Sequence, residues 1–396
     1  MTKNYDFTTL VNRTNDSSNK YMMMNEWKQD TKPDTVPFSV ADADIKTCPE
    51  IVEGLQEYIG QTVLGYTRVS DSYKEATINW NKNRHAWNVK ADWIVTSPGV
   101  VPAFYTAINS FTKPGDGVLI LSPVYYPFSD SIIASGRSLH ESHLINNFPR
   151  FEIDFADLEQ KLAQDEVKLM FLCNPHNPVG RVWTKEELTK ISELTLKHNV
   201  IVLSDEIHYD IIAPGYKQTV FATISEETSQ NCIVCTAPSK SFNIAGLQAS
   251  GIIIPNKELR EKFVHTQELN GFHGINMVGM KATELAYTKG DAWLEGFLNL
   301  LWTNKKVLED FIKTEMPELK MYELEGTYLP WIDFSCYGLS SEELEKTLHE
   351  AEIFFDEGYI FGKGGDQFER INMACPTHIL EKMLQDLKNT LHHLAK

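Results

Sequence analysis

Hydrophobic residues recur at two different spacings along the middle of this chain. Short apolar runs bounded by polar or turn-forming residues are typical of buried strands. Such runs cover residues 93–96, 118–121, 168–173, 200–204, 232–236 and 250–255. Between several of them apolar residues lie three and four apart, as in 185–197, where Thr184 can cap a helix. Strands that alternate with amphipathic helices predict an α/β fold with a mostly parallel sheet, covered by helices on both faces.

The pattern changes on both sides of this region. Residues 1–45 are polar and rich in turn-forming residues, so we expect an arm followed by a short extended segment. Helical spacing then predicts one helix from about residue 48 and a second over 70–83.

Past residue 257 the chain is mainly helical. The expected elements there are two helices and two strands, at residues 293–313, 376–393, 329–334 and 369–374. We therefore expect a large α/β domain over residues 48–288. A smaller α+β domain would be built from both chain ends, residues 1–47 and 289–396.

Composition narrows the class of protein. The chain has 396 residues, of which 42% are hydrophobic and 11% aromatic, enough for a large packed core. Its net charge is −17 and it has no Lys/Arg-rich block, which argues against nucleic acid or an anionic membrane as partner. Residues 1–10 lack an apolar signal segment and no run approaches the length of a membrane span, so we expect a cytoplasmic protein.

The six cysteines are scattered along the chain and are expected to be free thiols. Cys232 and Cys235 have the spacing of a redox or zinc motif. However, they lie inside a predicted strand, where positions three apart face opposite sides, and no second pair follows. We interpret them as structural cysteines.

The most informative lysine is Lys240, in the stretch Ala237-Pro238-Ser239-Lys240-Ser241. It follows the predicted strand 232–236 and so lies at the carboxyl edge of the sheet, where open α/β sheets bind ligands. A lysine that is removed from water can lose its proton and become an amine nucleophile. From this stretch alone, a solvated loop lysine is an equal alternative.

Other predicted strands end in residues that would meet Lys240 at this edge. Gly99 allows a tight turn before a helix whose first amides can bind an anion. Tyr125 offers an aromatic ring, Asn177 belongs to the second of two Asn-Pro steps, and Asp205 is a carboxylate whose burial needs a cation. Each of these taken alone also fits an ordinary turn or a core residue.

A nucleophilic lysine, a buried carboxylate, an anion cup and an aromatic ring are what pyridoxal 5′-phosphate (PLP) requires. The chain resembles fold-type I PLP enzymes related to the class I/II aminotransferases, and within them the MalY/PatB-type C–S lyases (cystathionine β-lyases). The resemblance runs from Asp6 to the segment around Arg370 and rests on separate motifs in the expected order. It implies the PLP-dependent transferase-like (aspartate aminotransferase) fold.

The resemblance also implies roles for individual residues. Lys240 would hold the cofactor covalently, Asp205 would pair with its pyridine nitrogen, and Tyr125 would stack on its ring. His208 would lie beside the cofactor. Asn177 would bind the ring's phenolic oxygen and also contact the substrate.

The substrate's α-carboxylate would be bound by Arg370, with the backbone at Ala41 close to it. The cofactor phosphate would be bound by the first amides of the predicted helix and by Ser239. Those amides belong to Gly99, Val100 and Val101. Tyr66 matches a tyrosine that reaches the phosphate from a neighbouring subunit, so the resemblance implies a homodimer.

The chain departs from the aminotransferase pattern at four positions. His208 stands where aminotransferases usually have tyrosine, and Gln248 where many have arginine. Ala237 replaces a serine that often binds phosphate, and Thr377 replaces a common arginine. His208 is also what C–S lyases have at this position.

Three functions are therefore considered. The first is a PLP-dependent β-lyase acting on cystathionine or other S-substituted L-cysteines, and the second is an aminotransferase on the same scaffold. The third is a non-catalytic regulator, which predicts a damaged PLP site. The sequence leaves the preferred S-substituted cysteine open, because no second cationic residue for a distal carboxylate is evident.

Overall fold

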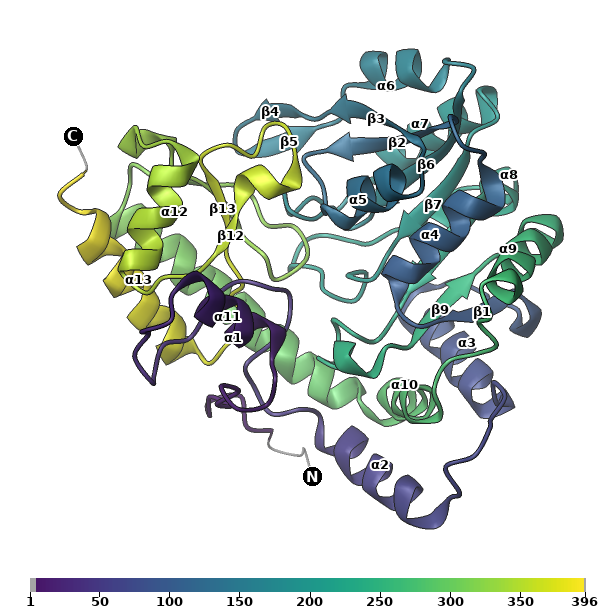
Figure 1. Ribbon diagram of the computed structural model, residues 1–396, viewed down its shortest axis with the longest axis horizontal. Helices are drawn as coiled ribbons and strands as arrows, with labels where there is room; N and C mark the ends of the chain where they lie inside the picture. Colours follow the sequence, from purple (N-terminus) through teal and green to yellow (C-terminus); the bar gives the residue numbers. More distant parts are fainter. Residues whose placement is uncertain (1–4, 395–396) are drawn as a thin grey trace.

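The computed structural model describes residues 5–394, in which a seven-stranded sheet forms the centre of the larger unit (Figure 1). The strand order is β1-β9-β8-β7-β6-β2-β3. The strands are β1 (Ile94–Ser97), β2 (Gly117–Ser122), β3 (Ser138–His143), β6 (Val167–Cys173), β7 (Ile201–Asp205), β8 (Cys232–Thr236) and β9 (Ser250–Ile253). Strand β9 runs opposite to the other strands, so the expected mostly parallel sheet is confirmed.

Helices cover both faces of this sheet. In β2, Val118 and Ile120 join one apolar cluster, whereas Leu119 and Leu121 join the other, as the two-residue period of a strand requires. The first cluster contains α4 (Val100–Phe111), α5 (Pro127–Ala134) and α9 (Lys257–Leu269). The second contains α2 (Pro49–Gln61), α3 (Asp71–His85), α6 (Phe155–Leu162), α7 (Lys185–Lys197) and α10 (Met277–Lys289). Short α8 (Glu226–Gln230) precedes β8, and the hairpin β4 (Ile145–Asn147) and β5 (Arg150–Glu152) follows β3.

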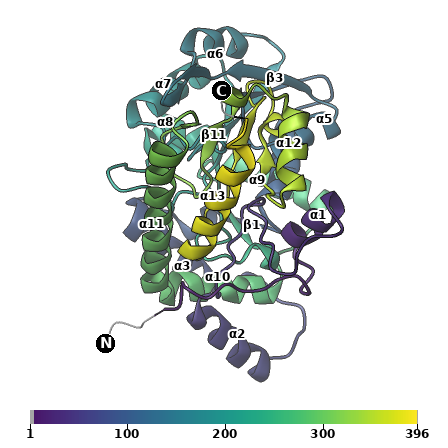
Figure 2. The ribbon, with the colours of Figure 1, turned by 90° about the vertical axis from the view of Figure 1, so that its left-hand side faces the viewer.

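The C-terminal part forms a second, antiparallel sheet with the order β10-β11-β13-β12. Its strands are β10 (Lys320–Met321), β11 (Trp331–Asp333), β12 (Asp356–Glu357) and β13 (Phe368–Arg370). The long helices α11 (Asp291–Glu315) and α13 (Thr377–Leu391) pack side by side (Figure 2), and α12 (Ser341–Glu350) precedes β12. The helices and strands predicted here are confirmed, although both strands are shorter than expected.

The arm expected over residues 1–45 contains a helix, α1 (Asn19–Trp27), and the expectation of an arm without one was wrong. Tyr21 and Met24 lie one helical turn apart and pack against Phe354 of the C-terminal part. Lys20 is buried and pairs with the Asp44 carboxylate at 2.7 Å. These long-range contacts stabilise a helix that the local sequence pattern does not predict.

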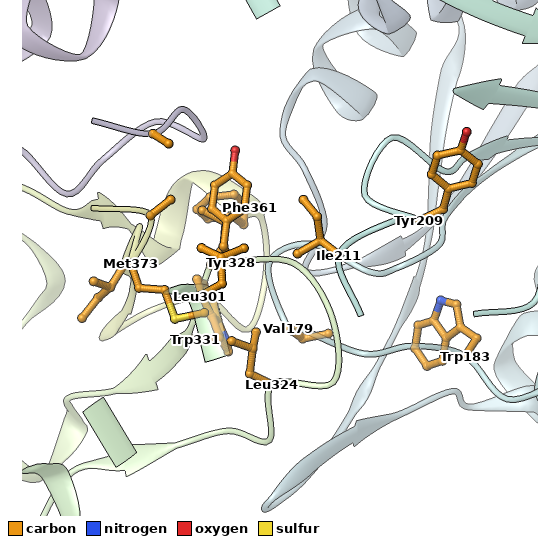
Figure 3. Packing of buried hydrophobic residues seen from close by; sticks show 14 of the residues in the cluster. Val179, Trp183, Tyr209, Ile211, Leu301, Leu324, Tyr328, Trp331, Phe361 and Met373 are labelled. Carbon is orange, nitrogen blue, oxygen red and sulfur yellow. The ribbon is translucent and has the colours of Figure 1, made fainter. Parts of the chain in front are cut away.

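One apolar core joins the two sheets. In Figure 3, Val179 and Ile211, from loops of the large sheet, face Tyr328, Trp331 and residues around them from the C-terminal part. The region between the seven-stranded and the four-stranded sheet is therefore bordered by packed side chains. All six cysteines are free thiols, as expected. Within residues 5–394 no helix has the length and apolar character needed to cross a membrane.

Candidate active site

A cavity of about 200 Å³ lies at the carboxyl edge of the parallel strands. It is lined by eight of the residues singled out from the sequence, namely Ala41, Val100, Tyr125, Asn177, Asp205, His208, Lys240 and Arg370. Strands β2, β6, β7 and β8 are parallel, so the loops that follow them carry their side chains to one edge of the sheet. The sequence-based expectation that these residues meet is correct.

Lys240 lies in the turn that follows β8, and its amine is removed from water. Nζ donates a hydrogen bond to the Ala41 carbonyl oxygen at 2.7 Å. Burial lowers the pKa of the Lys240 amine to about 8, although the nearby charge of Asp42 works in the opposite direction. The lysine can therefore present a neutral amine near neutral pH.

Asp205 is the last residue of β7 and is buried. Burial raises the pKa of its carboxyl to about 7, while the Ile207 N–H, 3.2 Å from Oδ1, and the charge of Lys240 oppose the rise. The charged form of such a buried carboxyl is stabilised by a cationic hydrogen-bond donor. The protonated pyridine nitrogen of PLP is such a donor, so this residue fits the cofactor.

His208 provides a second test of that fit. Its ring is buried, and among the described residues Nδ1 has no hydrogen-bond partner. Burial lowers the pKa of His208 well below its ordinary value, and the charges of Lys240 and Arg370 add to the shift. His208 lines the cavity, and a neutral imidazole with an unpaired ring nitrogen is suited to a polar group on a bound ligand.

Arg370, the last residue of β13, enters the cavity from the smaller sheet. Its guanidinium donates to Asp356 Oδ2 from Nη2 at 2.5 Å and from Nε at 3.2 Å. Nη1 donates to Asn177 Oδ1 at 3.0 Å. The Val40 N–H also donates to Asp356 Oδ2, at 3.0 Å, so the same carboxylate positions both the arginine and the arm.

Tyr125 and Asn177 are joined through their backbones, since the Tyr125 N–H donates to the Asn177 carbonyl oxygen at 3.0 Å. This bond ties the loop after β2 to the loop after β6. Tyr125 lies 5.5 Å from the Tyr126 ring, measured between centroids. An aromatic ring and an amide thus border the cavity from adjacent strands.

Four predicted site residues do not line this cavity. Gly99 and Val101 belong to the start of α4, where Gly99 has φ 106°, a conformation that favours glycine. Ser239 is buried immediately before Lys240. Tyr66 is fully exposed in the segment between α2 and α3. Their roles at the phosphate stay predictions.

Sequence reasoning missed several residues of the site, of which Asp356 matters most. The apolar run 353–355 directly before it is the same signal that pointed to Asp205, but the run is only three residues long. Tyr328 was also missed, and its hydroxyl donates to the Ala41 carbonyl oxygen at 2.8 Å. Asn19 lines the cavity from α1, which was not predicted.

The structure gives Thr377 a role that the sequence left open. Its hydroxyl donates to Asn304 Oδ1 at 2.8 Å, and the amide of Asn304 donates to the carbonyls of Met373 and Cys375. Thr377 therefore supports the segment that follows Arg370. Ala237, three residues before Lys240, is fully buried.

Comparisons with known proteins agree with this geometry. A family model described as aminotransferase class I and II matches residues 33–387. The chain belongs to this family. It is 42% identical over 359 residues to the cystathionine beta-lyase PatB of Bacillus subtilis (strain 168), covering 90% of this chain and 93% of the relative. The resemblance to the MalY/PatB-type lyases is thus confirmed.

Solved structures show the same relationship. Cystalysin from Treponema denticola, whose crystal structure contains pyridoxal 5′-phosphate, has a TM-score of 0.97 and 43% identity, covering 99% of this chain and 100% of its own. The PLP-bound C–S lyase from Staphylococcus hominis has a TM-score of 0.91 and 30% identity, with 98% of each chain covered. The expected PLP-dependent aminotransferase fold is confirmed.

Proposed function

We propose that this protein is a PLP-dependent carbon–sulfur β-lyase. It cleaves cystathionine or other S-substituted L-cysteines to a thiol, pyruvate and ammonia. The observation that carries the proposal is one cavity in which an amine of lowered pKa, a buried carboxylate and a positioned arginine converge. Relatives named as cystathionine β-lyases and C–S lyases support the choice of reaction.

In this proposal the residues of the cavity hold PLP in one orientation. Lys240 would bind its aldehyde carbon, Asp205 would keep its pyridine nitrogen protonated, and Asn177 and Tyr125 would hold the ring. When bound, PLP withdraws electrons from the Cα of the substrate. The first amides of α4, at Gly99, Val100 and Val101, bind the phosphate together with Ser239.

Arg370 binds the substrate's α-carboxylate through two parallel N–H groups, and Asp356 holds the guanidinium in place for it. Ala41 and the amide of Asn177 border this position. With PLP held by these residues, Lys240 would take the Cα proton as a neutral amine. The Cβ–S bond then breaks and its electron pair leaves with the sulfur, which is protonated to a thiol. Water completes the reaction by releasing pyruvate and ammonia.

The protein acts as a homodimer in this proposal. An apolar surface of α2 and the segment after it supports an interface, since Ile59 is 45%, Val63 85% and Leu64 68% exposed in the single chain. Tyr66, in the same segment, then reaches the cofactor phosphate of the neighbouring subunit. A cytoplasmic location fits this metabolic role.

We also propose the division into a large domain, 48–288, and a small domain from 1–47 and 289–396. All strands of the seven-stranded sheet lie within the first range, and the four-stranded sheet lies within the last. The candidate site uses residues from both, because Arg370 comes from the small domain and Lys240 from the large one.

Incubation with cystathionine and no 2-oxo acid tests the reaction. We expect thiol and pyruvate to appear in equal amounts, with no 2-oxo acid required. Product that forms only after a 2-oxo acid is added would identify an aminotransferase and overturn the lyase proposal. Absence of turnover and of bound PLP would favour the non-catalytic alternative.

A further inference from the structure

A cluster of metal-ligating side chains lies on the opposite side of the smaller sheet from the substrate cavity. Glu345 and His349 lie four residues apart on α12, so both side chains share one face of the helix. Glu357 belongs to β12. One ligand atom from each of the three lies within 4.8 Å of the others.

His349 and Glu357 lie close together without a hydrogen bond between them. His349 Nε2 lies 3.2 Å from Glu357 Oε1, yet this nitrogen makes no hydrogen bond with any described residue. A lone pair that is close to a carboxylate but not aligned with it can point to a shared centre. The side chains of both residues are largely buried, at 13% and 8% exposure.

A buried carboxylate next to the cluster supplies an independent observation. Glu369 is 2% exposed, and its Oε2 has no hydrogen-bond partner among residues 5–394. It pairs with Glu357 across β12 and β13, so the two side chains project from the same face of the sheet. Burial, with the charges of Glu357, Asp356 and Glu345, raises the pKa of Glu369 well above its ordinary value. The strand pairing thus places a second buried carboxyl on the face that carries Glu357.

Neighbouring side chains restrict the positions of His349 and Glu345. The Trp27 ring stacks on His349 at 5.1 Å between centroids and 18° between planes, and Phe354 lies 5.0 Å from the same ring. The Tyr359 hydroxyl donates to Glu345 Oε2 at 3.0 Å, which orients that carboxylate. Such supporting bonds are typical around metal ligands. A surface cavity lined by Glu345 and His349 offers a path for an ion.

We propose that Glu345, His349 and Glu357 bind a divalent transition-metal ion of the zinc type. Zinc takes imidazole nitrogen and carboxylate oxygen at about 2.0–2.2 Å, so two ligands of one ion lie at most about 4.4 Å apart. The present separations need only small side-chain movements. A nitrogen ligand disfavours magnesium and calcium, which prefer oxygen.

The position suggests what the ion does. The paired strands β12 and β13 carry Asp356 and Arg370, whose side chains are bonded to each other beside the substrate cavity. Glu357 directly follows Asp356, and Glu369 directly precedes Arg370. An ion bound to Glu357 and α12 joins the back of this strand pair to the helix. The site is therefore structural, and its ligands project to the opposite side of the sheet from the substrate.

Zinc content of the PLP-loaded protein tests the proposal. After incubation with ZnCl₂ and desalting, we expect one zinc per chain by mass spectrometry of the metal. Glu345→Gln and His349→Gln should each weaken zinc binding at least tenfold in equilibrium dialysis, whereas Glu261→Gln, at an exposed position of α9, should bind as the wild type does. The melting temperature should rise with zinc in the wild type and in Glu261→Gln only.

A measurement on the unaltered protein guards against variants that fail to fold. Titration with Co²⁺ should give visible d–d absorption that saturates at one equivalent and disappears when Zn²⁺ is added. Retention of no metal, binding unchanged in Glu345→Gln and His349→Gln, or binding of Mg²⁺ in preference to Zn²⁺ would each overturn the proposal.

Discussion

Lys240 and Ala41 lie 199 residues apart in the sequence, yet Lys240 Nζ donates a hydrogen bond to the Ala41 carbonyl oxygen at 2.7 Å. The Tyr328 hydroxyl donates to the same oxygen at 2.8 Å. The N-terminal arm therefore closes over the lysine, and Tyr328 helps to hold it there. The environment that lowers the pKa of Lys240 comes from both ends of the chain as well as from the central sheet.

The lowered pKa of Lys240 predicts how PLP capture depends on pH. A neutral amine attacks the PLP aldehyde, and below its pKa the neutral fraction falls about tenfold per pH unit. Because burial lowers the pKa of Lys240 from 10.5 to about 8, the rate of capture by PLP-free protein should rise with pH and level off near pH 8. Stopped-flow absorbance measures this rate. A rise that continues to about pH 10.5 would show a solvated lysine.

Asp205→Asn should retain PLP but lose most of the rate. A neutral amide cannot stabilise the protonated pyridine nitrogen, and breaking a buried charge pair costs several kcal/mol, on the order of a hundredfold or more in rate. The change is measured as kcat at saturating substrate and PLP. Asp130→Asn, on an exposed position of α5, is the control. A loss below about threefold in Asp205→Asn, which is under 1 kcal/mol, would exclude Asp205 as the partner.

Arg370→Lys should raise KM far more than it lowers kcat. Lysine keeps the charge but loses the two parallel N–H groups, and a hydrogen bond to a charged group is worth about 1.5–3 kcal/mol. The expected rise in KM is therefore about ten- to hundredfold. Arg150→Lys, in a partly exposed pair with Glu323, should leave KM unchanged. An unchanged KM in Arg370→Lys would remove this residue from substrate binding.

Tyr66→Phe should weaken PLP retention and leave the fold intact, since the lost hydrogen bond to the phosphate is worth about 1.5–3 kcal/mol. Mixing Tyr66→Phe with Lys240→Ala, under conditions of verified subunit exchange and without added PLP, tests the action in trans. In the hybrid dimer one site carries both changes and the other neither. The mixture should therefore exceed the mean activity of its two parents.

Wild-type protein mixed with Lys240→Ala is the control for subunit exchange itself and should show no such gain. No gain in the Tyr66→Phe mixture, or a fully active monomer in sedimentation, would exclude Tyr66 from the neighbouring site.

The central sheet and the candidate site were predictable because their signals are local. Each of Tyr125, Asn177, Asp205 and Lys240 follows an apolar run that ends in a turn, and parallel strands bring such turns to one edge. The strands were found within one or two residues for the same reason. Strand β3 was missed because it lies at the edge of the sheet, where Ser138–His143 needs few apolar residues.

The residues that were missed depend on contacts between distant segments. Helix α1 is stabilised by the buried pair of Lys20 with Asp44 and by packing on Phe354. Asp356 lies in a strand of two residues, and its importance follows only from the bond to Arg370. Neither partner is close in sequence, so spacing could not reveal them.

The residue that binds the cofactor tests the central claim most directly. Borohydride reduction of the PLP-loaded protein fixes the bond between a lysine and PLP, and peptide mass spectrometry then locates it. We expect a single modified peptide, with the added mass on Lys240. Lys240→Ala should lack both the label and the visible absorbance near about 420 nm that lysine-bound PLP gives, and should not release pyruvate from cystathionine. A label on another lysine, or wild-type turnover in Lys240→Ala, would contradict the account.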